Sequence, residues 1–112
     1  MQQSNSSIMI IPELEREKIF TQPVEGIIES LAFLCFAPTE IALLCDIPEE
    51  AFLDEISFKK GDRAKAYYKG KLKYQLEQRI TTAKFAIKGS PDAEKTMQQF
   101  LNKMKEEEYA EK

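Results

Sequence analysis

The stretch PTEIALLCDIPEEAFLDEI, residues 38–56, has the pattern of two short helices joined by a tight turn. Thr39 is a suitable N-cap for the first helix, because a threonine hydroxyl can accept a hydrogen bond from the first helical turn. Asp46 suits the turn and Pro48 the first position of the second helix. The predicted core of this helix-turn-helix consists of Ile41, Ala42, Cys45, Ile47, Phe52 and Ile56. A plain structural corner in a small helical protein would show the same pattern.

Apolar residues before this corner recur at three- and four-residue steps from residue 24 to residue 36, which predicts another helix. Together with the corner it gives an N-terminal trihelical helix-turn-helix unit over residues 23–58. We expect residues 1–22 to form a flexible N-terminal arm that begins with a polar segment, and Pro12 could open a brief helix through Glu13 to Phe20 within it.

Beyond the corner, Asp62 and Gly89 suit the two ends of a long helix, and Pro91 suits the start of another. We expect these helices to fold back as a long antiparallel hairpin over residues 59–112, with a frayed C-terminus. The predicted fold class is therefore all-α. One side of the long helix carries the apolar residues that we expect to be buried, namely Ala64, Tyr68, Leu72, Leu76, Ile80, Ala83 and Ile87.

The composition excludes several classes of function. The 112 residues are 43% hydrophobic and include no histidine, so the commonest general base is missing and we do not expect an enzyme. We predict no metal and no cofactor, because neither a ligand set nor a glycine-rich phosphate loop is present. Cys35 and Cys45 lie on predicted apolar faces and are expected to be core thiols. With no secretory signal and no apolar stretch long enough for a membrane span, we expect a cytoplasmic protein.

Charge is strongly segregated along the chain. Residues 1–58 contain two basic and eleven acidic side chains, whereas residues 59–88 contain ten basic and two acidic ones. Such segregation predicts surfaces of opposite sign that contact different partners. The second helix of the corner is itself acidic, which disfavours its entry into a DNA groove because phosphate repels it.

The basic stretch supplies the candidate contacts to double-stranded DNA, which are Lys59, Lys60, Arg63, Lys65, Lys69, Lys71 and Lys73. Lys65, Lys69 and Lys73 form a single stripe at four-residue spacing. A solvated lysine face that pairs with the acidic half of the chain would have the same composition. On the opposite side of the same helix, Tyr67, Tyr74 and Phe85 form an aromatic row that predicts either a contact between subunits or a half-exposed surface.

These segments resemble the small terminase subunits of tailed phages and prophages. That family carries an "EIA" corner with a leucine and a turn, a basic helix, an "A, K, x, G" end and a "P, x, A" restart. The matching segments are Glu40 to Ala42 with Leu44 and Ile47, Gly61 to Lys71, Ala86 to Gly89, and Pro91 to Ala93. The resemblance covers about Val24 to Leu101.

The resemblance implies a non-enzymatic protein of a bacterial host cell, encoded by a phage or prophage. Such a protein binds DNA at the packaging site, assembles into a homo-oligomeric ring and delivers DNA to a terminase large subunit, which is the ATPase. It also implies DNA contact by the corner and by Lys59 to Lys73, with Tyr67, Tyr74 and Phe85 between subunits.

Two other functions fit the sequence. One is a small transcription regulator of a phage or mobile element, which would bind an operator as a dimer. The other is a helical interaction module with no nucleic-acid role, in which the acidic corner and the basic hairpin bind each other across subunits. The mass of the protein in solution, with and without duplex DNA, separates these functions.

Overall fold

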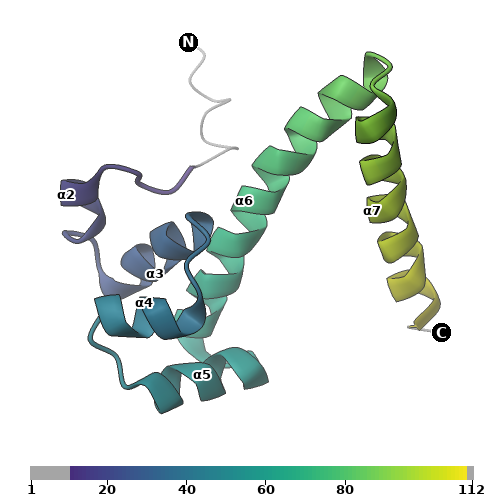
Figure 1. Ribbon diagram of the computed structural model, residues 1–112. Coiled ribbons are helices and arrows are strands. Elements are labelled where there is room, and N and C mark those ends of the chain that lie inside the picture. Colours follow the sequence, from purple (N-terminus) through teal and green to yellow (C-terminus); the bar gives the residue numbers. More distant parts are fainter. Residues whose placement is uncertain (1–10, 111–112) are drawn as a thin grey trace, which may run out of the picture. The chain divides into compact units, whose positions relative to one another are not determined.

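The computed structural model describes residues 11–110, and its regular elements within that range are all α-helices (Figure 1). The six helices are α2 (Arg16–Ile19), α3 (Val24–Phe33), α4 (Pro38–Leu44), α5 (Glu49–Phe58), α6 (Gly61–Ile87) and α7 (Pro91–Ala110). The predicted all-α class is confirmed. Residues 1–10 of the predicted arm and residues 111–112 of the predicted frayed end lie outside the described residues.

The chain divides into two compact units, one ending at Tyr74 and the other starting at Gln75, so α6 belongs to both. The sequence placed a boundary before Lys59, where the charge changes sign. The structure differs because the first half of α6 is part of the first unit, in which Ala64, Ala66 and Gly70 are buried.

The core of the first unit is formed by one to three apolar residues from each helix and by Ile47 in the turn between α4 and α5. Phe52 of α5, Ile28 of α3 and Ile41 of α4 are fully buried at its centre. The other buried residues of this core are Ile19, Leu31, Ala32, Ala42, Ile47 and Ala66. Because several helices contribute, the loss of any one large side chain would leave a cavity that the others cannot easily fill.

Gly70 lets α6 pass very close to α3. A β-carbon at position 70 would lie 2.1 Å from the carbonyl oxygen of Glu29, a separation far below any real contact. Glycine is therefore required where these two helices meet, and it fixes α6 against the core. This contact brings the basic stretch of α6 next to acidic residues of α3.

The turn between α4 and α5 has the left-handed residue that the sequence predicted. Asp46 has a φ of 57°, and the amide of Ile47 donates to the carbonyl of Ala42 at 2.9 Å. Thr39 is not the N-cap of α4, because the helix begins one residue earlier, at Pro38. Its N-cap is Ala37, whose amide donates to the Glu40 carboxylate at 2.9 Å. Pro48 precedes α5 as its N-cap residue instead of starting it.

The two thiols are free but differ in burial. Cys35 is exposed, in contrast to the predicted core thiol. The reason is that α3 ends at Phe33 and Cys35 takes a left-handed conformation with a φ of 72°, which turns it off the helical face. Cys45 is partly buried against the core, and burial, followed by the nearby Asp46 charge, raises the pKa of its thiol.

The second half of the predicted arm is ordered structure. Residues 16–19 form α2, and Ile19 is buried in the core of the first unit. Gln22 connects this segment to α3, since its side-chain amide donates to the hydroxyl of Ser30 at 3.1 Å. The brief helix expected within the arm is thus present at residues 16–19, where Ile19 anchors it to the core.

The second unit contains the end of α6 and all of α7. Gly89, with a φ of 101°, separates the two helices, and the Ser90 hydroxyl accepts the amide of Ala93 at 3.2 Å. The Arg79 guanidinium lies 4.2 Å from the centre of the Phe100 ring, which joins α6 to α7. Part of the predicted buried side of α6 is nevertheless exposed, in the first unit at Leu72 and in the second at the other two residues. The exposed residues are Leu72, Leu76 and Ile87.

Candidate nucleic-acid interface

The basic stretch begins at the tight connection between α5 and α6. Lys59 adopts a left-handed conformation with a φ of 54°, and the amide of Lys60 donates to the carbonyl of Glu55 at 3.1 Å. Gly61, with a φ of 90°, then begins α6. This connection places two lysines at the corner between the helices, beside the first turns of α6.

Tyr68 anchors α6 to α5 and organises the charges around it. Its hydroxyl donates to the carbonyl oxygen of Ile56 at 2.9 Å. The Lys59 ammonium lies 5.5 Å from the ring centre and the Lys71 ammonium 6.0 Å from it, both within the range of a cation–π interaction. The Tyr68 hydroxyl is therefore already used, and we do not assign it to a phosphate contact.

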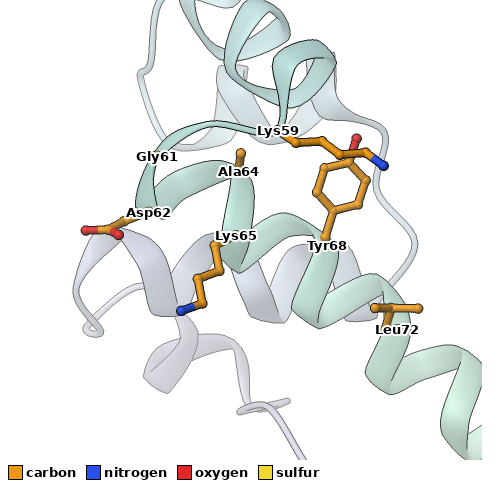
Figure 2. A pocket seen from close by; sticks show the side chains of 7 residues that line it. All are labelled: Lys59, Gly61, Asp62, Ala64, Lys65, Tyr68 and Leu72. Carbon is orange, nitrogen blue, oxygen red and sulfur yellow. The ribbon is translucent and has the colours of Figure 1, made fainter.

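A groove of about 610 Å³ lies along the start of α6. In Figure 2, the Lys59 side chain extends beside the Tyr68 ring, with Leu72 on the next turn of α6. Asp62 and Lys65 come from the first turns of α6 and also line the groove. The groove thus combines an apolar floor with a charged rim that holds two lysines and one aspartate. The residues that line it are Lys59, Gly61, Asp62, Ala64, Lys65, Tyr68 and Leu72.

Two of the seven predicted DNA contacts are already paired with carboxylates. Arg63 binds Glu55 through two nitrogens, at 2.9 Å and 2.5 Å. Its hydrogen bond lowers the pKa of the Glu55 carboxyl, and the same bond raises the pKa of Arg63. Lys73 binds Glu29 at 2.6 Å, with both side chains only 20% exposed. The predicted stripe of three lysines therefore ends at Lys69, because the close approach at Gly70 brings Lys73 to the carboxylate on α3.

The other five predicted contacts are exposed lysines, and none of them forms an ion pair with a residue in the range 11–110. We call them the lysine surface, which consists of Lys59, Lys60, Lys65, Lys69 and Lys71. Their ammonium groups are available for an anionic partner. A solvated surface of the same composition is the alternative that the sequence left open.

The three residues of the predicted aromatic row do not share one environment. Tyr67 packs against the core and meets the Phe52 ring edge-to-face at 6.5 Å, and desolvation is the main reason why its pKa is raised. Tyr67 is thus partly buried against its own chain and does not lie on a free outer side of α6. Tyr74 is at the edge of exposure and meets Phe33 edge-to-face at 5.9 Å. Phe85, by contrast, is 55% exposed.

The α5 helix has an acidic outer surface. Glu49, Glu50 and Asp54 are exposed and have no ion-pair partner within the described residues, whereas Glu55 is held by Arg63. Phosphate would be repelled from this helix, so the second helix of the corner is poorly suited to a DNA groove. The core residues predicted for the corner are buried or partly buried, so their role is to hold the helices of the first unit together.

The sequence left open a pairing of the basic stretch with the acidic half of the chain, and the two ion pairs that bridge helices are of this kind, but their partners were not identified. Glu55 and Arg63 are eight residues apart across a turn, a spacing that no single-helix rule describes. Glu29 and Lys73 are separated by most of the first unit. Gly70, three residues before Lys73, was the one sequence feature that marked a close helix contact.

Comparison with protein-family models, with curated proteins and with solved structures finds no match. Among residues 11–110 there is no group of three or more side chains able to hold a metal ion. No helix in the same range has the length and apolarity needed to cross a membrane.

Proposed function

We propose that this protein binds double-stranded DNA through the lysine surface and acts as the small terminase subunit of a phage or prophage. The observation that carries the proposal is the set of five exposed lysines at the start of α6, none paired with a carboxylate of the described chain. Lysines of this kind release counterions from DNA when they approach the phosphate backbone.

The proposal assigns backbone contact to α6 and no groove contact to α5. Lys65 and Lys69 are one helical turn apart on the same side of α6, a spacing of about 6 Å that suits contacts to nearby phosphates. Lys59 and Lys60 extend the positive surface beyond the start of the helix. Binding by phosphate contacts alone would be strong at low salt and weakly dependent on base sequence.

The packaging role comes from the resemblance to small terminase subunits, which implies a ring of copies and a large ATPase subunit as partner. The protein itself would be non-enzymatic. Exposed apolar residues in the second half of α6, Phe85 among them, support contacts between subunits, since a contact of this kind removes apolar surface from water. Tyr67 is assigned to the core of its own chain.

DNA binding is tested by reversing three charges of the lysine surface. Fluorescence anisotropy with a labelled duplex should show that binding is lost in the variant Lys60→Glu, Lys65→Glu, Lys69→Glu. The matched control is Lys84→Glu, Lys88→Glu, Lys95→Glu, which changes the net charge equally at three other exposed positions. Equal losses in both variants, or unchanged binding in the first, would refute a specific role for the lysine surface.

The packaging role is tested by mass. Light scattering of the full chain with and without duplex should give the mass of a ring of many copies. A dimer bound to a two-fold site would instead support a transcription regulator, and self-association without any affinity for DNA would support an interaction module.

A further inference from the structure

The groove on α6 has an apolar floor whose exposed part is Leu72, while Tyr68 is partly buried and Ala64 is buried. Leu72 is 60% exposed, and Tyr68 and Ala64 continue the floor at four-residue steps toward the start of the helix. Lys65 and Lys69 follow the same steps on one flank, and the Lys71 ammonium lies near the Tyr68 ring. The chemistry of this groove fits an apolar side chain flanked by carboxylates.

A surface of this chemistry exists on the same protein. Glu50, Asp54 and Phe58 of α5 are spaced by four residues and form one face, which we call the α5 stripe. All three are exposed, Phe58 at 69%, and neither carboxylate has an ion-pair partner among the described residues. The opposite face of α5, with Phe52 and Ile56, packs into the core, so the stripe points away from its own chain.

We infer that the groove on α6 is a docking site for the α5 stripe of a second copy of this chain. With the two helices parallel, Phe58 of one copy lies on Leu72 of the other. Asp54 then meets Lys69, and Glu50 meets Lys65, because steps of three or four residues advance a helix by about 5–6 Å. One contact thus covers exposed apolar surface and pairs two carboxylates with two lysines.

This contact uses Lys65 and Lys69, which the proposed function assigns to DNA. Self-association through the groove and duplex binding therefore compete, and DNA releases the α5 stripe when it takes the lysines. The docking itself does not depend on the proposed function. Only the competition rests on it.

Site-specific cross-linking tests the docking independently of any other subunit contact. The background variant replaces the native thiols by Cys35→Ser and Cys45→Ala. One chain then carries Phe58→Cys, the other carries Leu72→Cys, and the two are mixed and mildly oxidised at low salt. The expected product is a covalent dimer of the two chains. The matched control pairs Phe58→Cys with Phe85→Cys, a similarly exposed position on α6 outside the groove, and should give little product.

Charge reversal decides whether the complementary charges direct the contact. Adding Glu50→Lys and Asp54→Lys to the Phe58→Cys chain should abolish the dimer. Adding Lys65→Glu and Lys69→Glu to the Leu72→Cys chain should abolish it as well, and combining the two reversed chains should restore it. Failure of the cross-link, equal yield in the control, or failure of the reversed pair to recover would overturn the inference.

Duplex binding by the same chains separates the two proposals. The chain with Glu50→Lys and Asp54→Lys should bind duplex at least as well as the unmodified chain, since its lysine surface is intact and no longer covered. A cross-link that forms as expected, in a protein that binds no duplex, would retain the docking site and overturn the DNA-binding function.

Discussion

Lys69 and Lys73 lie one helical turn apart on α6, and the structure gives them different roles. Lys73 is held by Glu29 at 2.6 Å in a site where both side chains are only 20% exposed. Lys69 is exposed and belongs to the lysine surface. Methionine keeps most of the aliphatic stem of lysine and removes its charge. Lys73→Met should therefore lower the stability of the fold, and Lys69→Met should lower the affinity for DNA.

The magnitudes follow from these environments. Losing the partner of a charged, largely buried carboxylate costs about 1–2 kcal/mol after allowance for its remaining contact with water. For a unit of this size the Tm of Lys73→Met should therefore fall by about 5–10 °C. Lys69→Met should leave Tm nearly unchanged and reduce the slope of log affinity against log salt by about 0.9, the value for one phosphate contact.

Circular dichroism melting and fluorescence anisotropy with a labelled duplex measure the two effects on the same samples. The variant Glu29→Gln, Lys73→Met is the control, because removing the unpaired carboxylate should recover part of the lost stability. The reasoning is refuted if Lys73→Met melts like the unmodified protein, or if it weakens DNA binding as much as Lys69→Met does.

Three further changes test the packing and the Glu55–Arg63 pair. Gly70→Ala should destabilise the protein by about 1–3 kcal/mol in urea unfolding, because the new methyl group meets the Glu29 carbonyl; full stability would show that the helices do not touch there. Phe52→Ala should cost about 3–5 kcal/mol and leave little native circular dichroism, and a small loss would place Phe52 outside the core. The lowered pKa of Glu55 means that its pair with Arg63 stabilises the fold above the usual value of 4.5, and that this stability is lost as the pH falls through the folded-state pKa. Glu55→Gln should therefore lower the urea midpoint near neutral pH and make little difference in acid; the same effect at all pH values would contradict the assignment.

The helices and the corner were predictable because their determinants are local. Apolar residues at helical spacing, the left-handed Asp46 and the terminal Gly89 each act within a few residues of chain, and all three appear in the structure as expected. The capping of α4 was less predictable. Both Thr39 and Ala37 are near the start of that helix, and the choice depended on Glu40 reaching back to the Ala37 amide.

The environment of the basic residues was not predictable from local pattern. All seven cations look alike in the sequence, and only the packing of α6 against α3 and α5 separates the paired Arg63 and Lys73 from the others. Tyr67 likewise packs against the core although it was expected in the outer row, and Tyr68 packs against α5 as its place on the inner side predicted. Contacts between residues far apart in the sequence determine which cations are paired and which tyrosines are buried. Helical periodicity does not reveal such contacts.

The salt dependence of duplex binding tests the central claim most directly, namely that the unpaired lysines at the start of α6 contact the DNA backbone. If all five lysines bind phosphates, log affinity plotted against log salt concentration should fall with a slope of about −4.5. The variant Lys60→Glu, Lys65→Glu, Lys69→Glu should lose measurable binding. An affinity that does not change with salt, or no affinity for duplex DNA at any salt concentration, would contradict the claim.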